Sequence, residues 1–198
     1  MRQRPERLEL IPQPDPAALR RWGVADCGRV DRRALNRSLA RLRDDEVEPP
    51  LDTTRLVRHI RDRYHGVLIG LIEDAVSLAG ACEAAHSREA LWPHGLSDRM
   101  AEILEALEAH QQREDAVVFP MLLAGTPRVS QAATVMAAEH ARIREMLDAV
   151  RTLTLAFEAP PVACASWRVL YVLARKIDLD VRAQMRLEEC ELFGGGHP

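Results

Sequence analysis

Four long segments with helical periodicity, separated by prolines and glycines, constrain the fold of this 198-residue chain more than any other feature. They span about 53–86, 97–120, 128–157 and 162–193. In each segment apolar residues recur at the three- and four-residue spacing of a helix that buries one face. No segment alternates apolar and polar residues long enough to predict a strand. Four such helices joined by short loops bury their apolar faces against one another, so the sequence predicts an all-α, antiparallel up-down four-helix bundle.

The residues outside these segments predict an appendage and a tail. Residues 1–16 contain four prolines and predict an irregular chain, whereas 31–43 predict a short amphipathic helix. The charged stretch 44–50, DDEVEPP, ends in two prolines and predicts a linker. We therefore divide the chain into a short N-terminal helical segment with its linker at 1–50, the bundle at 51–193 and a disordered tail at 194–198. Within the bundle, Ser97 is the expected N-cap of the second helix.

Composition and charge exclude several classes of protein. Lys and Arg number 27 against 30 Asp and Glu, and this balance gives no basic excess for a nucleic-acid partner. The four cysteines lie far apart without a C-x-x-C pair, which argues against a disulfide framework and a zinc knuckle. The longest apolar stretch, 67–81, is interrupted by Glu73 and Asp74, so we expect no membrane-spanning helix. No apolar signal region is visible near residue 1, and we expect a cytoplasmic protein.

Histidines and carboxylates recur inside the predicted helices. His110 and Glu114 lie four residues apart, so both side chains share one face of the second helix. The other three helices add His65, His140 and Glu188 at compatible depths along the bundle. Taken singly, such residues are more often a surface ion pair or a hydrogen-bonded core histidine. Their coincidence favours a non-haem di-iron site, in which glutamates bridge two cations and imidazoles take terminal positions.

Helix geometry excludes His86 from this group. It follows His65 by 21 residues in what reads as one uninterrupted helix. At a rise of ~1.5 Å per residue the two are about 31 Å apart, too far to share a site. Only a kink near Gly66, Gly70 or Gly80 that folded the helix back would bring them together.

The motifs form a recognisable combination. They are Leu56-Val-Arg-His-Ile60 followed by Arg63-Tyr-His65, His110-x-x-x-Glu114 before Phe-Pro, Glu139-His140, and Leu187-Glu188 with Leu192-Phe193. Over roughly 51–193 this combination resembles the hemerythrin-like repair-of-iron-centres family. The resemblance implies a helical domain that holds two non-haem irons through four histidines and two bridging glutamates. It also implies a cytosolic protein of nitrosative and oxidative stress. By position, the resemblance assigns as iron ligands His65, His110, Glu114, His140 and Glu188.

The chain departs from that family's pattern at two places. Where the pattern has a histidine four residues before the last glutamate, this chain has Gln184, a weaker iron ligand than imidazole. Gln184, Asp180 or water then completes the site, and one iron is held less tightly. The pattern's N-terminal cysteine pair is reduced here to the single Cys27, which argues against iron transfer through paired thiols.

Three functions follow from these expectations. The first is a di-iron protein that binds nitric oxide or supplies iron to damaged iron–sulfur clusters, with iron–sulfur proteins as partners. The second is a reversible sensor or scavenger of NO or O₂. The third is a metal-depleted helical interaction module. Iron content distinguishes the third from the other two, and the repair of a damaged iron–sulfur enzyme distinguishes the first from the second.

Overall fold

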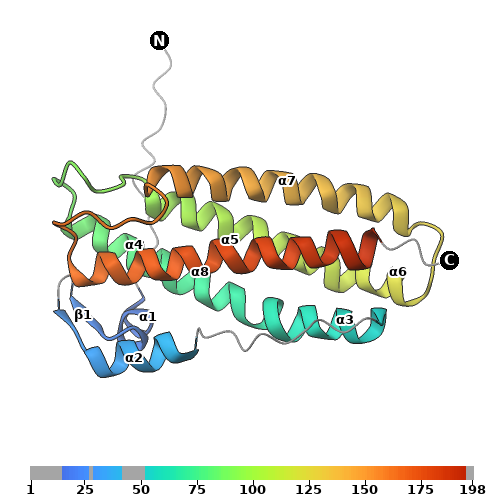
Figure 1. The fold of residues 1–198 in the computed structure, drawn as a ribbon, viewed down its shortest axis with the longest axis horizontal. Coiled ribbons are helices and arrows are strands. Elements are labelled where there is room, and N and C mark those ends of the chain that lie inside the picture. The colour runs from blue at the N-terminus through green and yellow to red at the C-terminus, as the bar shows by residue number, and fades with distance from the viewer. Residues whose placement is uncertain (1–14, 27–28, 42–51, 195–198) are drawn as a thin grey trace, which may run out of the picture.

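The computed structural model describes residues 15–26, 29–41 and 52–194, and its main body is the expected antiparallel four-helix bundle (Figure 1). Three of the four long helices are built from consecutive segments that include a wider, π-helical turn, here η1 to η3. The first consists of α3 (Thr53–Ile60), η1 (Arg61–His65) and α4 (Gly66–Ala85). The second consists of α5 (Leu96–Arg113), η2 (Glu114–Val118) and α6 (Phe119–Leu123). The third is α7 (Val129–Leu153), and the fourth joins α8 (Ala165–Leu187) to η3 (Glu188–Phe193).

The helix ends follow local chemistry, with two differences from expectation. The Asp52 side chain caps α3 by accepting the Arg55 backbone N–H at 2.9 Å. The prediction that Ser97 caps α5 is wrong, because the N-cap is Gly95. The positive φ of Gly95, 83°, lets the helix start at Leu96, and Ser97 is then buried in its first turn. The second helix also continues past Pro120, because this proline lies in the first turn of α6, where a missing N–H costs little.

Apolar side chains fill the bundle on both sides of a polar layer. The main core packs Ile72, Leu107, Ile143 and other fully buried residues between α4, α5, α7 and α8. A smaller apolar cluster contains Leu56, Val57, Ile60, Phe119 and Leu192, from α3, α6 and η3. Since η1 and η2 lie between these clusters along their helices, the polar residues there are enclosed by apolar side chains.

The described part of the N-terminal region packs against one end of the bundle (Figure 1). It contains α1 (Pro16–Arg21), the antiparallel strands β1 (Val24–Asp26) and β2 (Arg29–Val30), and α2 (Arg32–Arg41), which is the expected short helix. These strands are too short for hydrophobic alternation to reveal. The indole Nε1 of Trp22 donates to the buried Asp74 carboxylate of α4 at 2.8 Å.

Several sequence predictions fall outside the described residues. Cys27, the linker at 44–50 and most of the tail at 194–198 are among them, so the domain boundaries stay predictions. Within the described ranges, no helix combines the length and apolarity needed to cross a membrane.

Candidate metal centre

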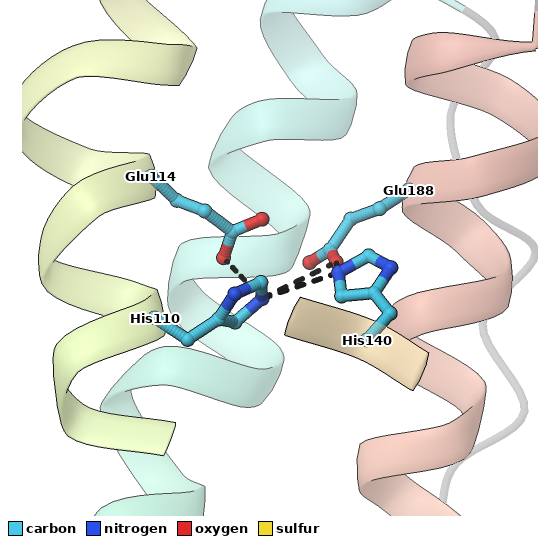
Figure 2. Close-up of side chains that lie close together, drawn as sticks. All are labelled: His110, Glu114, His140 and Glu188. Carbon is cyan, nitrogen blue, oxygen red and sulfur yellow. Dashed lines mark hydrogen bonds and ion pairs between the residues drawn. The ribbon is translucent and has the colours of Figure 1, made fainter. Parts of the chain in front are cut away.

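Four ligand-type side chains from three of the long helices meet in the polar layer of the bundle (Figure 2). They are His110 from α5, Glu114 from η2, His140 from α7 and Glu188 from η3. Each residue offers one nitrogen or oxygen atom, and these four atoms all lie within 4.8 Å of one another. All four residues are at most 1% exposed. This is a compact, dry group of the kind that holds a metal ion.

Imidazole nitrogens and carboxylate oxygens lie close together in this group. His140 Nε2 lies 3.1 Å from Glu188 Oε2, and His110 Nε2 lies 3.4 Å from Glu114 Oε2. The two histidine Nε2 atoms are themselves 3.2 Å apart. Both rings therefore direct the same nitrogen at one point between the two glutamates.

The first and fourth helices extend the group with His65 and Gln184. His65 Nε2 lies 3.2 Å from Glu114 Oε2 and 3.1 Å from Gln184 Nε2. The Gln184 amide donates to Glu188 Oε1 at 2.9 Å. The structure thus brings together all six side chains that the sequence singled out, and it places Gln184 on the same helix face as Glu188.

Two other candidates lie elsewhere. His86 is the C-cap of α4, where its Nε2 lies 3.2 Å from Cys164 Sγ and its ring stacks on Trp92. The first helix does not fold back toward His65. Asp180 is held by Lys176, with distances of 2.6 and 2.7 Å from Nζ to its carboxylate oxygens. Asp180 is therefore engaged by a lysine on its own helix.

The π-helical turns place three of the six side chains. His65 ends η1, while Glu114 and Glu188 begin η2 and η3. A π-turn adds one residue to a helical turn and is frequent at functional sites. Here two consecutive carboxylates in a wide turn reach the same imidazole. Glu114 and Asp115 contact the two nitrogens of His65, and Glu188 and Glu189 contact those of His140.

An arginine-held carboxylate fixes the outer nitrogen of each histidine, a feature that our sequence reasoning missed. The distances from Nδ1 to the carboxylate are 3.2 Å for His65, 3.0 Å for His110 and 2.9 Å for His140. The sequence does carry a signal for this feature. An arginine lies three or four residues from each histidine, and an acidic residue is the direct neighbour of Glu114, of His140 and of Glu188. In order, the sets are Arg61–Asp115–His65, Arg113–Glu139–His110 and Arg144–Glu189–His140.

These carboxylates determine what the centre can bind. A carboxylate at Nδ1 keeps the proton on that nitrogen, so the Nε2 lone pair is directed inward. Both oxygens of Glu114 and Oε1 of Gln184 are buried, and they accept no hydrogen bond from the residues that the structure describes. Buried acceptors without donors are costly, and a cation at their centre removes that cost. The donor set therefore fits a metal ion.

The surroundings of the two glutamates shift their pKa values in opposite directions. Burial and the neighbouring Glu188 raise the pKa of Glu114 well above its ordinary value. Burial also acts to raise the pKa of Glu188, but hydrogen bonds with His110 and His140 hold that pKa down to about 2. Burial alone would lower the pKa of both histidines, and Glu188 reverses the effect and raises it. Protons thus take part of the role that a cation would have.

Comparison with known proteins agrees with this donor set. Residues 56–194 match the family described as the Hemerythrin HHE cation binding domain. The chain is a hemerythrin-like protein. It is also 32% identical to the proteins named Iron-sulfur cluster repair protein YtfE of Yersinia pestis (strain Pestoides F) and Yersinia pseudotuberculosis (serotype O:1b, strain IP 31758). Each match spans 151 residues, which is 76% of this chain and 67% of the relative.

These matches confirm the resemblance to the repair-of-iron-centres family. The matched range begins at Leu56 and ends at Gly194, so it contains all six side chains of the centre. A hemerythrin domain with a buried histidine and glutamate group is a binding site for non-haem iron.

Proposed function

We propose that this hemerythrin-like protein holds two non-haem irons and supplies iron to damaged iron–sulfur clusters. The observation that carries the proposal is the convergence of six ligand-type side chains, from all four long helices, on one buried layer. The relatives named as iron–sulfur cluster repair proteins point to the same activity, with iron–sulfur proteins as partners. The cytoplasmic location expected from the sequence accompanies this proposal and is itself a prediction.

The six side chains divide naturally into two iron positions. His110 and His140 meet between the glutamates and would hold the inner iron. His65 and Gln184, whose Nε2 atoms lie 3.1 Å apart, are on the side nearer the first helix and would hold the outer iron, Gln184 through its carbonyl oxygen. Glu114 and Glu188 contact members of both pairs, which is the arrangement that two bridging carboxylates require. The outer position is the weaker one, because an amide is a poorer iron ligand than imidazole.

The protein's own residues prepare this chemistry. The arginine-held carboxylates keep the imidazoles in one tautomer and orientation, and the apolar clusters on both sides exclude water. When bound, ferrous iron provides an open position for NO or O₂ and is the metal that a damaged cluster needs. The weaker ligands of the outer position favour release of its iron over permanent retention.

Anaerobic purification followed by metal analysis tests the proposal. We expect about two irons per chain in the loaded native protein and restored activity when that protein is mixed with an iron–sulfur enzyme inactivated by nitric oxide or peroxide. His86→Ala is the control, since His86 lies outside the centre. A chain without iron would support the metal-depleted interaction module. Two irons and a stable NO adduct without repair would support the sensor or scavenger.

A further inference from the structure

An open pocket lies against the outer side of the centre. It has a volume of about 760 Å³ and is bounded by residues of η1, α4, α5 and η2, among them His65, Gln111, Gln112 and Asp115. Its wall includes two carboxylates, Glu108 and Asp115, and one guanidinium, that of Arg61. The pocket therefore favours a cation slightly and is large enough for a hydrated one.

His65 forms the wall between this pocket and the centre. Its Nδ1 meets Asp115, which also lines the pocket, and its Nε2 meets Glu114 and Gln184 inside. The His65 side chain is 7% exposed, whereas those of His110 and His140 are 1% and 0% exposed. His65 is thus the imidazole of the centre with the most direct connection to solvent.

A buried, unpartnered amide also points to a ligand here. Gln111 is 5% exposed and lines the pocket, and its buried Nε2 has no hydrogen-bond partner among the described residues. A buried polar group without a partner is costly to retain. A small movement of this side chain would let its Nε2 donate to an occupant that carries oxygen, such as the water shell of a metal ion.

We propose that iron enters and leaves the outer position through this pocket, as a hydrated ferrous ion, with His65 as the movable wall. The proposal rests on the proposed function and names the cargo and route of the same centre. Asp115 is a positioning residue: with Arg61 it holds the outer nitrogen of His65, through a 2.7 Å bond from Arg61 Nε to Asp115 Oδ1. Asp115 is 42% exposed, more than its counterparts Glu139 at 25% and Glu189 at 34%.

A blocked pocket tests the route. Gln112 is exposed on α5, so Gln112→Trp places a large side chain in the pocket without altering the core. The matched control is Arg142→Trp, at an exposed position of α7 near His140. Both variants and the native protein are loaded with ferrous iron, checked for helix content, and mixed with ferrozine. We expect two phases of iron loss, with the faster one slowed about tenfold in Gln112→Trp alone.

Equilibrium iron content separates a blocked route from a damaged site. A blocked route slows loading and loss equally, so the iron content of Gln112→Trp at equilibrium should equal that of the native protein. An unchanged fast phase, or slowing by Arg142→Trp to the same degree, would overturn the route while leaving the proposed function intact. Absence of iron from the native protein would overturn the proposed function instead, and the route with it.

Asp115→Asn tests the positioning role. Loss of the charged partner leaves the His65 ring less firmly oriented. Removing such a partner of a metal-binding histidine typically lowers metal affinity about tenfold to a hundredfold. We expect the fast phase of iron loss to accelerate and the slow phase to stay unchanged. Glu189→Gln, which makes the matched change at His140, should accelerate the slow phase. The same acceleration of both phases by both variants would show a general loosening of the bundle and would refute the assignment.

Discussion

Glutamine in place of Glu114 separates the stability of the bundle from its capacity for metal. The Glu114 carboxyl is fully buried, and burial together with Glu188 raises its pKa well above the ordinary 4.5. In the unfolded chain at pH 7 the same group is ionised, and because its pKa is raised in the folded state, folding without metal takes up part or all of a proton. At ~1.36 kcal/mol per pKa unit, this uptake costs at most about 3 kcal/mol at pH 7. A glutamine side chain is uncharged in both states and avoids the cost.

The surroundings of Glu114 also suit an amide. Its Oε2 lies 3.2 Å from His65 Nε2 and 3.4 Å from His110 Nε2, so a glutamine amide is within reach of both rings, its NH₂ donating to a neutral imidazole and its oxygen accepting from a protonated one. We therefore expect metal-free Glu114→Gln to be more stable than the native protein by up to about 3 kcal/mol. For a chain of this size, ~2–4 °C per kcal/mol gives a rise in Tm of up to about 10 °C.

The sign of the pH dependence follows from the raised pKa. Below the unfolded pKa of 4.5, Glu114 is protonated in both states and its cost disappears. As the pH rises toward the folded pKa, the unfolded chain loses its proton first and the native protein loses stability relative to Glu114→Gln. The stability difference between the two proteins should therefore be small near pH 5 and larger near pH 7.5.

Calorimetric melts of metal-free samples at these two pH values measure the effect. Glu105→Gln, at an exposed glutamate of the same helix, is the matched control and should not change Tm. Iron should then raise the Tm of the native protein and have little effect on Glu114→Gln, because an amide cannot bridge two irons as a carboxylate does. A Tm of Glu114→Gln below that of the native protein at both pH values would refute the reasoning.

Three further predictions concern the ligands. Glu188→Ala should remove both irons while His65→Ala leaves about one, because a bridging carboxylate holds two ions and a terminal imidazole holds one; equal iron retention by metal analysis would contradict these roles. Gln184→His should slow iron loss to a chelator, whereas His86→Ala should not change it; the reverse result would mean that the ligand set is wrong. Iron binding should release protons and weaken as the pH falls from about 8 to about 6, because the pKa values of Glu114, His110 and His140 are raised. Calorimetry in buffers of different ionisation enthalpy measures this proton release, and the absence of any release would contradict metal binding by these groups.

The sequence predicts those parts of the centre that lie within single helices. His110 with Glu114, and Gln184 with Glu188, share a face because residues four apart are neighbours on any α-helix. The long separation along the first helix likewise excludes His86, and the structure places that residue beside Cys164 instead. Such inferences need only the rise and period of a helix, so they hold before any packing is known.

Contacts between helices were not predictable in the same way. The pair of Glu139 with His110 joins residues 29 apart on two helices, and no spacing rule specifies it. The wide turns that begin at Arg61, Glu114 and Glu188 depend on which side chains they must orient, and ordinary helix propensity does not distinguish them from α-helix. The cap of α5 was mistaken because Gly95, two residues before Ser97, can adopt a positive φ that few other residues tolerate.

The order of ligand strength across the centre agrees with the position of the pocket. The inner pair, His110 and His140, is enclosed and consists of two imidazoles. The outer pair combines His65, the most exposed imidazole of the centre, with the weaker amide of Gln184. In a protein that must retain both irons, placing the weakest ligand beside the open pocket would promote loss of the outer iron. That loss would also leave the bridging glutamates with one cation instead of two. In a protein that must deliver one iron and rebind another, the same arrangement lowers the barrier at the outer position while the inner position keeps the bundle folded.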